Sequence, residues 1–329
     1  MLASRVGFLE FIRIAMDDSA SPTSGYVIKV SSLSVNFSQE YSIKEYSEKG
    51  IDATVYNLSG TNLSISFSTP LKNIEFGAYK LIEKSISQYE ERTSVSPTTF
   101  SIYASYYGTL HGCVVSEVTI ESDEGGPIIV SFEILARYLD HTTKMLAQDN
   151  NYLYMDLPTT RNFMFYDIYL RMAPSYWNFH LPDISEFSCY MKSFSLKIAN
   201  NTQVNWTLAA QVDIPDALLP QSIVAPKDIT IGGRKIEGTI TYTMPHNDLL
   251  GFYKVLQNNT PLILSVSDTL LQGNPTYLTF EVNHPIFTLP EKPNEVGILQ
   301  QTVSFVGARS QLDSDFNSAI YYSHIFEDS

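Results

Sequence analysis

The residues that most often bind metals or carry catalysis are sparse and widely separated in this chain. Of its six histidines, none lies three or four positions from another histidine or from a cysteine, the spacing by which a helix presents two zinc ligands. The two cysteines, Cys113 and Cys189, form no Cys-x-x-Cys pair, and we expect both to be small buried hydrophobic residues. The sequence therefore predicts no metal site and no cofactor.

Two short motifs could be taken for binding sites, and a structural interpretation is favoured for each. Ile231-Gly-Gly-Arg234 could cradle a phosphate, but no helix pattern follows it to supply a helix N-terminus, so we expect a hairpin turn before a strand at 234–243. Asp123-Glu124 could form a calcium site or an acid–base pair. It lacks the Asp-x-Asp-x-Asp-Gly ladder of a calcium loop, which favours a solvated turn.

Enzyme signatures are also absent from the sequence. Neither the Gly-x-Ser-x-Gly motif of serine nucleophiles nor the Gly-x-Gly-x-x-Gly motif of dinucleotide sites occurs. The carboxylate pair of a glycoside hydrolase is defined by distance in space, so a hydrolase stays open as an alternative that rests only on abundant Asp and Glu. We predict that the protein is not an enzyme.

The elements that would position functional side chains are predicted to be strands. Aromatic residues make up 12% and charged residues only 17% of 329, which together with abundant Ser and Thr favours strands over long solvated helices. Helical spacing occurs only near 71–93 and 247–258. The fold class is therefore mainly β, and the length is typical of about two domains.

Apolar and polar residues alternate with period two, which indicates strands with one buried and one polar face. The alternating apolar positions are Leu33, Val35 and Phe37, then Leu63, Ile65 and Phe67, and in the second half Ile236, Ile240 and Tyr242. Residues 117–134 are predicted to form a hairpin, because Gly125-Gly126 can adopt the positive backbone angles of a tight turn.

The first half of the sequence is echoed, in order, by the second half. The matching segments are 8–15 with 166–173, 32–35 with 193–196, 64–68 with 239–243, 76–82 with 252–256, and 130–137 with 303–309. We interpret the echo as a duplicated fold, with domains at 1–150 and 151–329, each a β-barrel or sandwich flanked by a short helix. Two unrelated β domains that share the alternating pattern are the alternative.

Two long excursions interrupt the strands at the same place in each half. Residues 38–60 are polar and charged, whereas residues 199–230 are apolar and contain several prolines. Long loops inside compact domains are usually functional, and an apolar one has little reason to face solvent. The residues that we expect to contact a partner surface are Leu218, Leu219, Ile223 and Val224.

The chain is acidic, with a formal net charge of −14 spread along its length. No basic run offsets this charge, so stable binding to nucleic acid is not expected. No stretch reaches the 18 or more apolar residues of a membrane span, which predicts a soluble protein, made in a cytoplasm, that does not insert into membranes.

Several segments together resemble the tail tube proteins of long-tailed bacteriophages. The segments that carry the resemblance are 234–242 (RKIEGTITY) and 299–305 (LQQTVSF) in the second half, and 112–120 (GCVVSEVTI) with 130–133 (VSFE) in the first. The resemblance covers about residues 6–145 and 163–310. Such proteins commonly carry one unit per chain and form hexameric rings, whereas this chain carries two. Some members fuse two units and form trimeric rings with pseudo-sixfold geometry.

This resemblance implies a structural virion protein whose rings stack into a tail tube, with an acidic channel for DNA passage to the host. The implied partners are further copies of the chain and other tail proteins, such as the tape measure, sheath or terminator. The excursions would contact the next ring, and DNA would pass without sticking. A baseplate hub or tube initiator is the first alternative. A carbohydrate-binding adhesin that uses Tyr176, Trp177 or Trp206 is a less favoured one.

If the polar strand faces line the channel, five acidic residues are expected to face the DNA. These channel candidates are Glu117, Glu121, Asp123, Glu133 and Glu237. Carboxylates there would repel phosphate groups. The alternative is that the same side chains form an ordinary solvated outer face.

Overall fold

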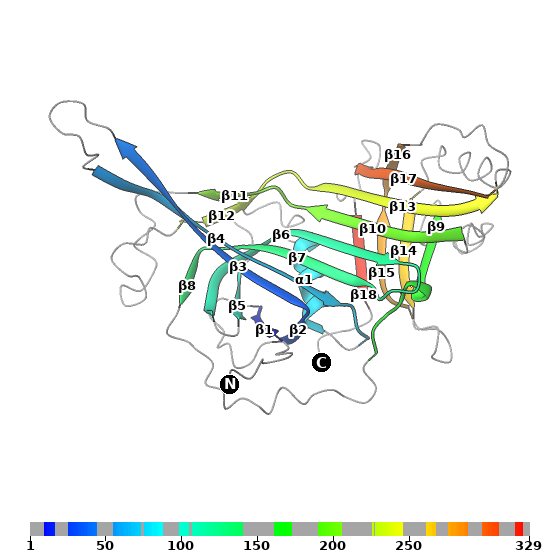
Figure 1. The fold of residues 1–329 in the computed structure, drawn as a ribbon, viewed down its shortest axis with the longest axis horizontal. Coiled ribbons are helices and arrows are strands. Elements are labelled where there is room, and N and C mark those ends of the chain that lie inside the picture. The colour runs from blue at the N-terminus through cyan, green and yellow to red at the C-terminus, as the bar shows by residue number, and fades with distance from the viewer. Residues whose placement is uncertain are drawn as a thin grey trace, which may run out of the picture.

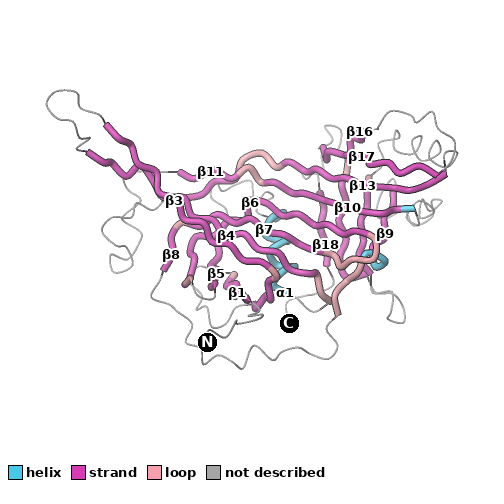
Figure 2. Tube along the Cα trace, in the orientation of Figure 1, coloured by secondary structure: helices cyan, strands magenta, loops and turns pink. Residues whose placement is uncertain are grey.

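The protein is mainly β, as the alternating pattern predicted (Figures 1 and 2). The computed structural model describes residues 10–16, 26–44, 55–73, 76–87, 99–104, 107–140, 161–172, 190–205, 226, 228–245, 261–267, 276–288, 298–308 and 320–324. Its α-helix, α1 (Phe76–Ser87), falls within the first segment with helical spacing. The second such segment, 247–258, lies outside the described residues. In the described ranges, no helix is long and apolar enough to cross a membrane.

One antiparallel sheet, which we call the main sheet, runs through both halves of the chain. Its strands, in spatial order, are β3 (Ser32–Lys44), β4 (Val55–Pro70), β7 (Ile129–Ala136), β6 (Gly108–Asp123), β10 (Met191–Ala199), β13 (Lys235–Pro245), β17 (Ile298–Ala308) and β16 (His284–Thr288). The predicted hairpin at 117–134 is confirmed as β6 and β7, with Gly125 at φ 77° in the turn. Asp123 and Glu124 lie exposed at this turn.

Each half adds a second sheet behind the main sheet. In the first half this sheet contains β2 (Tyr26–Val30), β1 (Glu10–Ala15), β5 (Phe100–Ala104), the beginning of β6, and β8 (Tyr138–Asp140). In the second half it contains β9 (Ile168–Met172), β14 (Leu262–Ser267), β15 (Thr276–Val282) and β18 (Ile320–His324). Strand β6 passes from one sheet to the other near Gly112, whose φ of 64° favours glycine. A Cβ there would lie 2.5 Å from the Arg137 side chain.

The strand pairings of the first half recur in the second half in the same order. In the main sheet, β3–β4–β7–β6 has the same pairing order as β10–β13–β17–β16. In the second sheets, β1–β5–β6–β8 has the same pairing order as β9–β14–β15–β18. The halves do not close as separate barrels, because β6 of the first half pairs with β10 of the second and makes their main sheets one.

The described parts of both excursions include strands, which corrects the expected loops at those residues. Residues 38–60 include the end of β3 and the start of β4, and this hairpin projects from the main sheet (Figure 1). Residues 199–230 include β11 (Thr202–Asn205) and part of β12 (Asp228–Ile231), which pair with each other and continue the β10–β13 hairpin. The predicted hairpin turn at residues 231–234 is therefore wrong. These residues connect β12 to β13 along one side of the long hairpin that β10–β13 and β11–β12 form together. The strand expected after them is confirmed as β13.

The core lies between the main sheet and the elements behind it. Leu63, Ile65 and Phe67 of β4 are buried, as their alternation predicted. Helix α1 covers the same side of the sheet and contacts β2, β6 and β18. Its buried residues include Ala78, Leu81, Ile82 and Ile86. One hydrophobic cluster contains residues of both halves, so the halves are packed together and not merely linked. Cys113 is buried as expected, and Cys189 lies outside the described residues.

Polar contacts lock the two halves together beside the β6–β10 pair. The Asn200 side chain is fully buried, and its Nδ2 donates to the carbonyl oxygens of Ser85, 2.9 Å away, and Val115, 3.1 Å away. The Arg234 guanidinium donates to the Ile86 carbonyl at the end of α1. Buried carbonyl groups of the first half are thus satisfied by side chains of the second half.

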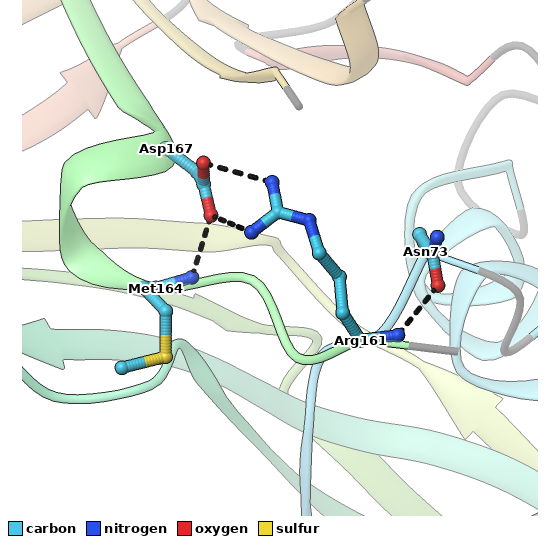
Figure 3. Close-up of polar contacts among 4 residues, drawn as sticks. All are labelled: Asn73, Arg161, Met164 and Asp167. Atoms are coloured by element: carbon cyan, nitrogen blue, oxygen red, sulfur yellow. Dashed lines mark hydrogen bonds and ion pairs between the residues drawn. The ribbon is translucent and has the colours of Figure 1, made fainter. Parts of the chain in front are cut away.

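A second contact holds the segment that leads into the second half (Figure 3). Arg161 donates two hydrogen bonds, of 3.0 and 3.1 Å, to the fully buried carboxylate of Asp167, which also accepts from the Met164 N–H at 2.9 Å. The Asn73 side chain accepts a hydrogen bond from the Arg161 N–H at 3.1 Å. Phe163 donates to the Leu71 carbonyl at 2.8 Å. The segment is therefore anchored to the first half.

We predict that Asp167→Ala lowers the free energy of unfolding by about 2–4 kcal/mol, because Arg161 and the Met164 N–H lose a buried carboxylate partner. Urea unfolding followed by circular dichroism measures this loss. The matched control is Glu124→Ala, which removes an exposed ion pair with Lys192. That change should cost less than about 1 kcal/mol. Equal losses in the two variants would contradict the structural role given to Asp167.

Candidate functional site: the polar face of the main sheet

The main sheet has one apolar and one polar face, because residues paired across antiparallel strands point to the same side. One row on the apolar face is Leu33, Phe67, Phe132, Val118, Ile198, Ile236, Gly307 and Pro285. The neighbouring row on the other face is Ser32, Ser68, Ser131, Thr119, Lys197, Glu237, Val306 and Ile286. The polar face is therefore continuous from one half of the chain to the other.

All five predicted channel candidates lie on this polar face. Glu117, Glu121 and Asp123 alternate along β6, and Glu133 of β7 is paired directly with Glu117. Glu237 of β13 shares a row with Thr119 through Lys197. Glu121, Asp123 and Glu133 are exposed. The structure thus gathers on one surface carboxylates that are far apart in the sequence.

Two lysines that the sequence reasoning missed also lie on the polar face. Lys197 Nζ is 2.7 Å from Glu117 Oε2, so this ion pair links β10 to β6 across the junction of the halves. Lys235 makes an ion pair with Glu237. Ser193, Ser195 and Lys197 alternate with apolar residues along β10, and that pattern is the signal that could have found Lys197.

The ion pair alters the titration of Lys197. Its hydrogen bond to Glu117 raises the pKa of Lys197 above the ordinary value of 10.5, and partial desolvation opposes the rise. The carboxylates of Glu237 and Glu133 favour the charged ammonium group further. Lys197 therefore stays protonated at neutral pH and offsets part of the acidic charge.

The five channel candidates and the two lysines of the polar face lie on its four central strands. Outside them, β3 and β4 present mainly serines to this face, and their hydroxyl groups contact each other, as in the 2.8 Å Ser32–Ser68 pair. At the opposite margin of the same face, the hydroxyl oxygens of Thr302 on β17 and Thr241 on β13 are 3.0 Å apart. An acidic central band is thus flanked by strands that present hydroxyl groups.

A shallow hollow lies where the acidic band meets the second half. It has a volume of about 400 Å³, and its lining includes Glu121, Asp123, Ser193, Ser195 and Thr239. Within the part of the chain that the structure describes, no cluster of three or more His, Cys, Asp or Glu residues could hold a metal ion. The carboxylates of this surface repel phosphate groups.

The expected contact residues Leu218, Leu219, Ile223 and Val224 lie outside the described residues. The strands that flank them, β11 and β12, extend from the same end of the main sheet as the β3–β4 hairpin (Figure 1).

The strands that form this surface lie within a segment that matches a known protein family. The profile of one protein family, described as phage tail tube protein, matches residues 15–305. That match spans both halves and the whole main sheet except the end of β17. No curated protein matches the chain significantly.

We predict that Glu117→Gln lowers the pKa of Lys197 towards its ordinary value, as measured by NMR titration of the lysine side chain. Because the folded pKa is raised, the pair stabilises the protein below pH 10.5, and the stabilisation is lost as pH rises through the folded value. Lys197 is 40% exposed, so the free energy involved is below about 1 kcal/mol. Glu121→Gln is the control, and it should leave the pKa of Lys197 unchanged.

Proposed function

This chain belongs to the phage tail tube protein family, and on that premise we propose that it builds the wall of a tail tube. In this proposal copies join into rings, the rings stack, and the polar face of the main sheet lines a channel through which genomic DNA passes to the host. As a family member the protein is a structural component of the virion tail. Other tail proteins, such as the tape measure, sheath or terminator, are the further partners that we propose.

The observation that carries the proposal is the continuous, one-sided main sheet. Its apolar face is covered by α1 and the second sheets, so the polar face is the side left for water and DNA. Glu121, Asp123 and Glu133 are exposed on it, and the flanking strands present hydroxyl groups. A channel wall of this kind repels the DNA backbone and offers no row of cations to bind it.

We further propose that the halves 1–150 and 151–329 are duplicated units that occupy equivalent positions in the ring. The recurrence of the strand pairings supports this, as does the echo of sequence segments. Three chains would then supply six units. Each chain would contribute an eight-stranded arc of wall, from β3 to β16.

The hairpin ends are our proposed contact between successive rings. Hairpins β3–β4 and β11–β12 extend from the same end of the main sheet, where they would reach a neighbouring ring. Leu218 and Leu219 follow β11 in the sequence, and burying such apolar residues against the next ring would stabilise the stack.

We predict that the purified protein forms rings and tubes with a central channel in negative-stain electron microscopy, and that mass measurement of isolated rings finds three chains. Leu218→Asp combined with Leu219→Asp should leave the rings intact and shorten the tubes, because the substitutions introduce negative charge only at the contact between stacked rings. Ring-only assembly of the unmodified protein would favour a hub or initiator ring. A monomer at all concentrations would contradict the proposal.

We also predict that Glu121→Lys combined with Glu133→Lys leaves tubes assembling but slows genome release. Lysines on the channel wall would contact several phosphates, so the tubes should retain duplex DNA at low salt and release it steeply as salt rises. Glu83→Lys, on the exposed side of α1, is the control that adds a lysine away from the polar face. If residues 121 and 133 react with bulky labels on the outside of intact tubes, the channel assignment is wrong.

A further inference from the structure

The base of the β11–β12 hairpin rests on the first half of the chain, and both sides of the hairpin are held there. On the β11 side, the Thr202 hydroxyl donates to the Ser116 hydroxyl at 2.9 Å, and the Asn200 N–H donates to the Ser116 carbonyl at 2.8 Å. On the β12 side, Arg137 Nε donates to the carbonyl oxygen of Pro226 at 3.2 Å. A contact made on the hairpin is therefore transmitted to the first half through these residues.

Arg137 is held in place by the strand on which it lies. Its backbone N–H donates to the His111 carbonyl at 2.9 Å. Its side chain lies over Gly112, where a Cβ would be 2.5–2.9 Å from three carbon atoms of the arginine. The bond to Pro226 then fixes the guanidinium two residues before β12 begins at Asp228.

Two charged groups at this base each have a buried atom without a partner. Among the described residues, neither Arg137 Nη2 nor Asp228 Oδ1 has a hydrogen-bond partner, although both atoms are buried. Such atoms are costly, because nothing in the protein replaces the hydrogen bonds to water that they lose on folding. The two groups carry opposite charges, and Asp228 lies two residues after the carbonyl that Arg137 binds. An ion pair between them would satisfy both atoms.

We propose that Arg137 and Asp228 are a latent ion pair, which closes when a neighbouring ring binds the β11–β12 hairpin. This inference rests on the proposed function, in which that hairpin takes part in the contact between rings. In the isolated chain the two atoms are unpaired, while β12 is held in its ladder with β11. A shift of β12 toward the first half brings the carboxylate to the guanidinium.

The ion pair couples the contact between rings to the base of the hairpin. A neighbouring ring can shift β12 only if it binds the paired arrangement more tightly than the unpaired one. By the reciprocity of coupled equilibria, closing the pair then strengthens the binding of the neighbouring ring. Because the pair forms only in stacked rings, it favours tubes over single rings without stabilising the isolated chain.

Asp228→Asn tests the latent pair, because it removes the charge and nearly keeps the shape of the side chain. Unassembled protein with this change should unfold at the same temperature as the unmodified chain or at a higher one, since a neutral amide is less costly to bury. The critical concentration for tube formation, measured by sedimentation, should rise roughly tenfold, as expected for the loss of one charged hydrogen bond. A purely structural role would weaken folding and assembly together.

A charge-matched control and a second substitution accompany this variant. Glu83→Gln removes one carboxylate charge from the exposed side of α1 and should change neither measurement. Adding Asp228→Asn to Arg137→Met should leave the critical concentration of the Arg137→Met protein unchanged, because the partner of the carboxylate is already gone. If Arg137→Met does not fold, electron cryomicroscopy of tubes of the unmodified chain replaces it, and should show Nη2 and Oδ1 about 3 Å apart.

Tubes that form at the same concentration with and without Asp228→Asn would overturn the latent pair and leave the proposed function standing. A loss of stability in the unassembled Asp228→Asn protein would also overturn it, because the carboxylate would then already have a partner there, such as a buried water. An unmodified chain that forms no tubes at any concentration would overturn both the latent pair and the proposed function.

Discussion

The hydrogen-bonded seam between β6 and β10 is the constraint on which the rest of this structure depends. Without it the chain would hold two separate four-stranded sheets, each with two open edges. With it, a single sheet runs from β3 to β16 and has one apolar and one polar face. Side chains that reach across the seam, Lys197, Asn200 and Arg234, satisfy charges and carbonyl groups of the first half. The relative placement of the halves follows from these contacts.

The one-sided sheet also separates two physical tasks. Apolar burial against α1 and the second sheets stabilises the fold, because it removes side chains such as Phe67 and Phe132 from water. The polar face contributes little to this burial, so its residues can be chosen for what they contact outside the subunit without a loss of core packing. Acidic residues are gathered in the central band and hydroxyl groups at the margins, a distribution suited to a wall along which a polyanion moves.

Much of the candidate surface could be predicted from alternation alone. Because side chains on a strand point alternately to its two faces, Glu117, Glu121 and Asp123 had to share one face, as did Ser131 and Glu133. Lys197 obeys the same rule, because it alternates with buried Leu196 and Ile198 on β10. The strands at the ends of both excursions were predicted as loops because each hairpin has a break in its register, after Glu40 and after Ala199, and such breaks interrupt the alternating pattern.

The sequence by itself determined the β class, the hairpin at Gly125-Gly126, the apolar and polar strand faces and the family, because these depend on local periodicity, turn chemistry and motif order. Only the tertiary structure decided that the halves share one sheet, that Lys197 neutralises Glu117, and that Arg161 and Asp167 anchor the connecting segment. The first two join residues of different strands, and the third depends on the contact of the Arg161 N–H with Asn73, 88 positions away in the sequence. Edge pairing uses backbone groups that every residue except proline carries, so side-chain patterns do not specify which strands meet.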